Sequence, residues 1–395
     1  MIPSWIVFLF VLLFIMLLSK YELSIILIIG NIIFALVAQV NLVGSFLNVF
    51  LDPSIIFLEI AVSIIPLLGG IMEESGLMKE LLEKLNVKKK TSLMLSPALF
   101  GLLPVAGGAL MSAPIVDEID REIKPNRKVA INVWFRHLLI LIYPLSSALI
   151  FLSYLAGINL YLFVVYLLIP FLMMGLVGYI YYLRPLTLKE EQSQRDIKGA
   201  IKNLSPLLIA PLIDFIGRTF FAIPYNELYL VIGLMVSLFL ALTLAKMPVS
   251  SLKNISKKMK LWRFPLLILA MFWFAEIFTL SGVPEDIAGL NLPFLLFLCL
   301  GFFLGFATGR IQVPVSILVP IYLINFATSA IILFDFLFLY CAIFFGYLLT
   351  PIHPCVAYSI NYFDINYKQT IKELALPSFF CFGLLIGCYF VISLF

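Results

Sequence analysis

Charged residues are scarce in this sequence. Asp, Glu, Lys and Arg together make up 12% of the 395 residues, whereas soluble domains carry roughly 25%. Hydrophobic residues make up 63%, and the mean hydropathy is +1.11. This composition excludes an ordinary soluble domain and predicts an all-α polytopic membrane protein. The net charge of +4 is small, so we expect no nucleic acid partner.

Metal-binding and redox motifs are also missing. The two histidines and five cysteines follow no Cys-x-x-Cys or Cys/His spacing, and no Walker A motif, zinc motif or nucleophile elbow is present. We therefore expect no enzyme, no metal site and no cofactor, apart from a sodium ion or a proton as coupling ion. The cysteines, each alone in an apolar run, are Cys299, Cys341, Cys355, Cys381 and Cys388.

Long apolar runs dominate the sequence instead, and runs of about 17–25 residues can cross a bilayer as helices. We expect about ten full spans, near 3–19, 23–42, 54–72, 128–150, 158–183, 203–223, 226–245, 263–281, 333–360 and 373–395. An amphipathic helix is expected at 77–87. Two further apolar stretches, 91–120 and 292–330, are interrupted by glycine and proline.

The first interrupted stretch carries Gly101, Pro104, Gly107 and Gly108, a run that breaks a helix. Both of its flanks are basic. If the N-terminus lies outside and the stretch returns to the side it entered, 23 of the 26 basic residues fall in inside segments and none in outside loops. This is the separation that the positive-inside rule requires. The charge pattern therefore predicts a re-entrant hairpin over 91–120 that enters from the cytoplasm, with both chain termini outside.

The second interrupted stretch mirrors the first. Residues 301–314 read GFFLGFATGRIQVP, and the flanks have no basic residues, so we expect entry from outside. The two halves also have the same spacing, because Glu74 precedes Gly107 by 33 residues and Glu276 precedes Gly309 by 33. Each hairpin is followed by a span that proline interrupts.

Each half therefore reads as three spans, a hairpin and two more spans. We predict repeat 1 at 1–183, a cytoplasmic linker at 184–202 and repeat 2 at 203–395. Inverted repeats of this kind are typical of secondary transporters, whose sites lie near the midplane at interrupted helices. Chance similarity between two hydrophobic halves is the alternative explanation.

The two oppositely inserted hairpins, with PVAGGALMSAP at 104–114 of the first, resemble the ion transporter superfamily. That superfamily includes divalent-anion/sodium symporters and gluconate and citrate permeases, and the chain looks most similar to an uncharacterised integral membrane branch. The resemblance implies a homodimer in which a mobile transport domain carries substrate by an elevator motion. Sodium-coupled members often carry Ser-Asn-Thr at each tip, whereas the tips here read Val-Ala-Gly at 105–107 and Ala-Thr-Gly at 307–309.

The resemblance also implies where the site lies, at both hairpin tips and at the breaks of the following spans. A broken helix exposes free N–H groups at its N-terminal tip, and these suit an anion. The implied substrate-binding residues are Pro104, Ala106, Gly107, Gly108, Ser112, Ser146, Ser147, Thr308, Gly309, Arg310, Gln312 and Thr350. The expected coupling residues are His353 and Glu276.

Three arginines fall inside predicted membrane segments, where a charge costs about 2.5–3.5 kcal/mol on insertion scales. Arg310, beside the second tip, is either an anion clamp or the partner of Glu276 or another acid. Arg136 is expected to snorkel to the inner surface. Arg218 follows Asp214 by four residues, which favours an ion pair on one helix face.

The two histidines are interpreted differently. His353 lies between Pro351 and Pro354 in a broken span, and it is either a proton-coupling group or a polar core residue. His137 is expected to be structural.

The most probable function from sequence is therefore an elevator-type secondary transporter. It would move a small, carboxylate-like organic anion across the plasma membrane, coupled to a proton or sodium gradient. A channel built on the same hairpins and an intramembrane enzyme acting on lipid are the alternatives. The expected partners are the substrate, the lipid bilayer and a second copy of the chain.

Overall fold

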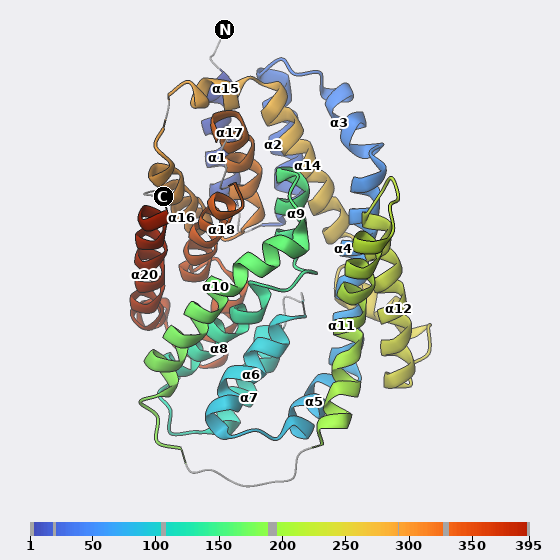
Figure 1. Ribbon diagram of the computed structural model, residues 1–395, viewed down its shortest axis with the longest axis vertical. Helices are drawn as coiled ribbons and strands as arrows, with labels where there is room; N and C mark the ends of the chain where they lie inside the picture. Colours follow the sequence, from blue (N-terminus) through green and yellow to red (C-terminus); the bar gives the residue numbers. More distant parts are fainter. Residues whose placement is uncertain are drawn as a thin grey trace.

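The computed structural model describes residues 4–18, 21–103, 108–188, 196–290, 292–326 and 332–392. All regular structure in these ranges is helical, and they contain no strand (Figure 1). Seven helical segments in this part of the chain are long and apolar enough to cross a membrane. The expected all-α class is therefore confirmed, and the apolar helices are what a membrane-embedded protein requires.

The first half of the chain contains α1 to α10 and one π-helical turn. The bounds are α1 (Ser4–Leu18), α2 (Leu23–Val37), α3 (Leu42–Phe50), α4 (Pro53–Glu74), α5 (Leu77–Leu85), α6 (Lys89–Gly101), α7 (Gly108–Ile119), α8 (Pro125–Ile140), α9 (Ser147–Ala156), α10 (Leu160–Gly178) and η1 (Tyr179–Leu183).

The second half contains α11 to α20. The bounds are α11 (Ile197–Phe220), α12 (Glu227–Ala245), α13 (Ser251–Lys258), α14 (Arg263–Leu280), α15 (Val283–Ala288), α16 (Phe294–Thr308), α17 (Gln312–Phe326), α18 (Ile332–Leu349), α19 (Pro354–Tyr362) and α20 (Tyr367–Ile392).

The predicted span at 23–42 was wrong at its C-terminal end. Helix α2 stops at Val37, the chain turns through Gln39 with a positive φ of 58°, and a new helix begins at Leu42. Asn41 caps that helix, because its side chain accepts a hydrogen bond from the Gly44 N–H at 2.9 Å. The capping signal was present in the sequence, but the apolar run on both sides of it concealed the turn.

Both interrupted stretches form pairs of short helices. Helices α6 and α7 have 13 and 12 residues, so each is about 18–20 Å long at a rise of 1.5 Å per residue. Helices α16 and α17 have 15 residues each. Figure 1 places α6 and α7 in the lower half of the molecule and α17 in the upper half. None of these arms matches the roughly 30 Å hydrocarbon core of a bilayer.

Helices α8 and α18 form the centre of the fold. They pack against each other, α8 also receives the hairpin arm α6, and α18 receives the arm α16. The backbones approach so closely that a Cβ at Gly101 of α6 would lie 2.0 Å from the Arg136 carbonyl oxygen. A Cβ at Gly346 of α18 would lie 1.9 Å from the Phe302 carbonyl oxygen. Both contacts therefore require glycine.

Helices α1–α4 and α11–α14 form a second group. Helix α2 packs on α1 and α14, and α12 packs on α11 and α4. The short helices α3 and α13 pack on α14 and α4, respectively, and α4 contacts α14. Many apolar side chains on α1, α2, α11 and α12 are exposed, as expected for helices that face lipid.

Candidate functional site

Both spans that follow the hairpins are broken where proline predicted it. Helix α8 ends at Ile140 and α9 begins at Ser147, while α18 ends at Leu349 and α19 begins at Pro354. Proline has no N–H to donate and clashes with the preceding turn, so Pro144 and Pro351 interrupt the helical hydrogen bonds. Each break leaves a new helix N-terminus inside the fold.

These two N-termini have no side-chain cap. The N-cap residue of α9 is Ser146 and that of α19 is His353, and neither side chain accepts a hydrogen bond from the first turn. The leading N–H groups of a helix carry a partial positive charge and need an acceptor. Both breaks therefore present donors that an anion can use.

The second hairpin tip reaches both breaks. Gln312, at the start of α17, donates from Nε2 to Ser147 Oγ at 3.1 Å. Gly309 has a φ of +61°, and a Cβ there would lie 2.6 Å from Cγ1 of Ile352 in the second break. The tip residues predicted from the sequence therefore meet both breaks in space.

The tip itself is held by Thr308. Its hydroxyl donates to the Leu304 carbonyl oxygen at 2.7 Å and lies 3.0 Å from the Arg310 carbonyl oxygen. Thr308 is buried, and Arg310 is half-buried. Among the remaining predicted residues, Thr350 is buried and Ser146 is half-buried at the breaks. Thr308 consequently shapes the turn that carries Arg310.

The first tip is described only in part. Pro104, Ala106 and Gly107 lie outside the described residues, and Gly108 is the first residue of α7. Ser112 is buried, and its hydroxyl donates to Asn132 Oδ1 of α8 at 2.6 Å. Ser112 therefore has a structural partner already.

Asn132 was missed by the sequence reasoning, although it ties three helices together. Its Nδ2 donates to the Ala109 carbonyl oxygen at 3.2 Å and to Ser359 Oγ of α19 at 2.9 Å. The sequence signal that could have found it is an amide side chain inside the expected membrane span 128–150, where such groups often bond across helices.

The two histidines meet at the second break. Nε2 of His137 lies 3.1 Å from Nε2 of His353, and both side chains are fully buried. The ring of Tyr347 lies 4.0 Å from that of His353, centroid to centroid. Their meeting was not predicted, because 216 residues separate them in the sequence.

Two cations flank this pair. Arg136 is only 2% exposed and donates from Nη2 to the Leu103 carbonyl oxygen at 3.3 Å, so the prediction that it snorkels to the surface was wrong. The packing of α6 over α8 encloses it. Arg136 and Arg310 both act electrostatically on His353.

Arg310 has no carboxylate partner within the described ranges. The ion pairs found there join other residues. The alternative partner, Glu276, instead accepts a hydrogen bond from Asn48 Nδ2 at 3.0 Å. Arg310 and Glu276 therefore form no ion pair in this structure. Arg310 is a cation at the hairpin tip without a carboxylate partner among the described residues.

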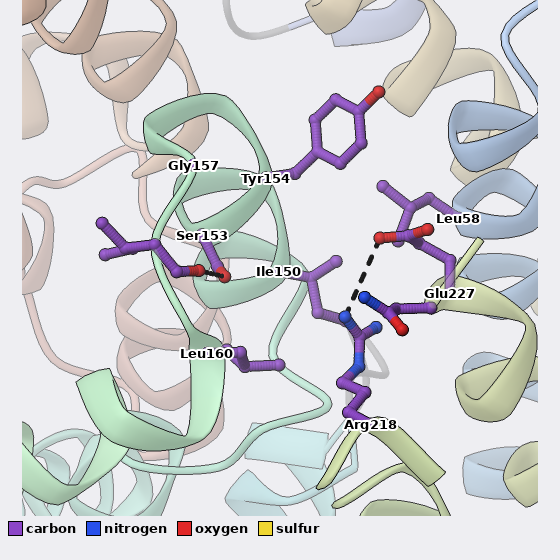
Figure 2. A pocket seen from close by; sticks show the side chains of 10 residues that line it. Leu58, Ile150, Ser153, Tyr154, Gly157, Leu160, Arg218 and Glu227 are labelled. Carbon is purple, nitrogen blue, oxygen red and sulfur yellow. Dashed lines mark hydrogen bonds and ion pairs between the residues drawn. The ribbon is translucent and has the colours of Figure 1, made fainter. Parts of the chain in front are cut away.

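Arg218 behaves as predicted. Its Nε lies 2.8 Å from Asp214 Oδ1 on the same helix, and Nη1 lies 3.8 Å from Glu227 Oε1. Figure 2 shows the guanidinium extending toward Glu227 beside a cavity of about 260 Å³, which Ser153 and Tyr154 also line. This cavity lies between α9 and the helices α4, α11 and α12, and not at the hairpin tip.

A second cavity of about 190 Å³ contains Glu276. Asn48, Asp52 and Tyr154 line it as well, and the Tyr154 hydroxyl donates to Asp52 Oδ2 at 3.1 Å. The structure therefore places Glu276 with Asn48, Asp52 and Tyr154, whereas His353 lies near the tip that carries Arg310. The two predicted coupling residues are not brought together.

Comparison with known proteins identifies the family but gives no activity. No curated protein matches the sequence. The family model described as "Protein of unknown function (DUF401)" matches residues 3–392. This match spans nearly the whole chain, including both hairpins and both breaks, and the chain therefore belongs to the DUF401 family.

Proposed function

We propose that this protein is a secondary active transporter for a small organic anion of carboxylate type. The observation that carries the proposal is the second hairpin tip, which bears Arg310, a residue with no carboxylate partner among the described residues, and whose Gln312 and Gly309 contact two breaks with helix N-termini that lack side-chain caps. Cations and free N–H groups together recognise an anion. A charge inside a membrane segment is costly unless an anion or another partner completes it.

The packing supports two inverted repeats. The contact of α2 with α14 corresponds to that of α12 with α4, and the contact of α3 with α14 corresponds to that of α13 with α4. Likewise α9 packs on α17 as α19 packs on α7, and α8 packs on α20 as α18 packs on α10. In each case the second contact follows from the first when the helices of the two halves are exchanged.

The same packing supports an elevator mechanism. Helices α1–α4 and α11–α14 form one group, and the hairpins with the broken spans form another. In the proposal the first group is a scaffold that dimerises with a second copy, while the second group carries the anion across the membrane. The two cavities described above border both groups, since Tyr154 of α9 lines each of them. The driving gradient is one of protons or sodium ions.

Replacement of Arg310 tests the proposal directly. In a thermal-shift screen of small mono- and dicarboxylates, a true ligand at 100 times its Kd stabilises the wild type by about 2.7 kcal/mol. Arg310→Ala should lose this stabilisation and keep its elution volume on size exclusion. The matched control is Arg263→Ala, because Arg263 pairs with Glu22 at 2.7 Å on another part of the surface and should leave the shift unchanged.

Transport in proteoliposomes separates the possible outcomes. Saturable uptake of the ligand, driven by a proton or sodium gradient and absent in Arg310→Ala, supports the carrier. Equal stabilisation of Arg310→Ala and wild type by the same anion would overturn the anion site. Unsaturable flux would instead indicate a channel, and product formed in detergent without a gradient would indicate an enzyme.

A further inference from the structure

The histidine pair has a third potential ligand beside it. His137, His353 and Cys355 each offer one ligand atom, and these atoms all lie within 4.8 Å of one another. His137 comes from α8, while His353 and Cys355 come from the break and the first turn of α19. Both histidines are fully buried, and Cys355 is a half-buried free thiol.

The hydrogen bonds of the pair leave one buried ring nitrogen, Nδ1 of His353, without a hydrogen bond among the described residues. His137 Nδ1 lies 2.6 Å from the Val133 carbonyl oxygen, so Nδ1 carries a hydrogen, and Nε2 of the neutral ring is a bare acceptor. His353 must then donate from Nε2 across the 3.1 Å contact. Its Nδ1 is left bare and buried, with no hydrogen bond among the described residues.

Two neutral rings hold two hydrogens, and the contacts at His137 Nδ1 and between the two Nε2 atoms use both of them. A cation bound by both Nε2 atoms would displace the hydrogen from the Nε2–Nε2 contact, so that His353 could carry it on Nδ1 as a hydrogen-bond donor. Metal-bound histidines typically make this kind of second hydrogen bond.

We propose that His137, His353 and Cys355 bind a soft monovalent metal cation of the Cu(I) type. Ligand atoms at about 2.0–2.3 Å from such an ion lie about 3.3–3.6 Å from one another. The two Nε2 atoms are 3.1 Å apart and need to separate only slightly. Rotation of the half-buried Cys355 side chain can bring its sulfur atom closer.

The charges around the cluster select a monovalent ion. When the metal binds, the S–H bond of Cys355 breaks, the sulfur keeps the electron pair and coordinates the ion, and the proton leaves to water. A monovalent ion therefore adds no net charge. A divalent ion adds one positive charge near Arg136 and Arg310, which both act on His353. Thiolate sulfur also favours Cu(I) over harder ions.

The inference is independent of anion transport, because it concerns metal affinity alone. A bound ion would tie α19 to α8 across the second break. The experiment titrates purified, detergent-solubilised protein with Cu(I) under anaerobic conditions against a coloured Cu(I) chelator. The wild type should hold one Cu(I) per chain, and X-ray absorption should show two nitrogen ligands and one sulfur ligand.

Cys355→Ser and His353→Gln should each weaken Cu(I) affinity by at least about 100-fold. The matched control is Cys381→Ser, which removes a buried thiol of α20 and should leave the affinity unchanged. Elution on size exclusion confirms that each variant is folded. If the chelator removes Cu(I) as readily from the wild type as from Cys355→Ser, the metal site is overturned, and a third proton shared by the two histidines completes the pair instead.

Discussion

Both hairpins pack closely on the centre of the fold through a glycine contact, but they differ in how many polar contacts they add to this packing. The first hairpin is held on α8 by a polar stripe, in which Lys128, Asn132 and Arg136 follow one another at intervals of four on one face of the helix. Lys128 Nζ lies 2.6 Å from Asp117 Oδ1, Asn132 binds Ser112 and Ala109, and Arg136 binds the Leu103 carbonyl. The stripe therefore follows the hairpin from the end of α7 near Asp117 toward its tip.

The second hairpin is held on α18 mainly by packing. Helix α18 is buried along most of its length and contains no charged residue after Asp335, whose Oδ2 accepts from the Tyr322 hydroxyl at 2.6 Å. The ring of Tyr322 also packs on that of Phe336, and Gly346 makes the close backbone contact with Phe302. The difference shows that hydropathy alone identifies the apolar α18, whereas α8 is buried although it carries polar residues.

The packed contact should be the most sensitive to a single added methyl group. In Gly346→Ala, the Cβ would lie 1.9 Å from the Phe302 carbonyl oxygen, which is backbone and cannot rotate away. We expect a loss of at least about 3 kcal/mol of unfolding free energy, or no folded protein. The measurement is thermal unfolding in detergent.

Gly383→Ala is the matched control, because a Cβ at Gly383 meets nothing within 4 Å. It should equal or slightly exceed the wild type, since alanine favours helix. A Gly346→Ala variant as stable as Gly383→Ala would show that α16 and α18 are not in close backbone contact.

Alanine substitutions in the polar stripe should cost less unfolding free energy than Gly346→Ala, and the effects of two contacting residues should be coupled. Hydrogen bonds between membrane helices contribute about 0.6 kcal/mol on average and up to about 1.7 kcal/mol. A double-mutant cycle of Asn132→Ala with Ser359→Ala should give a coupling energy in this range, because their side chains are 2.9 Å apart. The same cycle between Asn132→Ala and Ser378→Ala of α20 should give none, and equal coupling in both cycles would refute the direct link.

The polar contacts of Glu80, which lie outside the central helices, should have the smallest effect on stability. Hydrogen bonds from Lys84 and Asn203 lower the pKa of Glu80 on α5 below its ordinary value of 4.5. A lowered carboxyl pKa stabilises the fold above the unfolded value, and this contribution is lost as the pH falls through the folded value.

Glu80→Gln should therefore be less stable than the wild type at pH 7 by less than about 1 kcal/mol, because the side chain is half exposed. The difference should shrink as the pH is lowered below 4.5. Melting temperatures of both proteins between pH 7 and the acid limit of stability measure it. A difference that grows in acid would have the wrong sign and would contradict this assignment.

Much of the helical layout followed from the sequence. The breaks after Ile140 and Leu349 lie where proline predicted them, and the Arg218–Asp214 pair followed from a spacing of four. These features are local, because one helix turn or one missing N–H decides them. The number of full spans and the repeat boundaries stay predictions.

The site was only partly predictable, because its contacts join different helices and are not local. The structure brings Gln312 of the second tip to Ser147 of the first break and Gly309 to Ile352 of the second break, while their role in binding stays a prediction. Asn132 and the burial of Arg136 were missed, because nothing in α8 itself reveals that α6, α7 and α19 cover it. The hydrophobic periodicity of a segment predicts a helix, but it does not predict which other helices pack against it.

The sequence by itself determined an all-helical, membrane-embedded chain with glycine and proline interruptions in each half, because hydropathy and backbone chemistry act over a few turns. Only the tertiary structure decided that His137 meets His353, that Arg310 lacks a carboxylate partner within the described residues, and that a polar stripe adds to the packing of the first hairpin but not of the second. Those contacts join residues from opposite halves or separate helices, and their free energy exists only once the helices have packed.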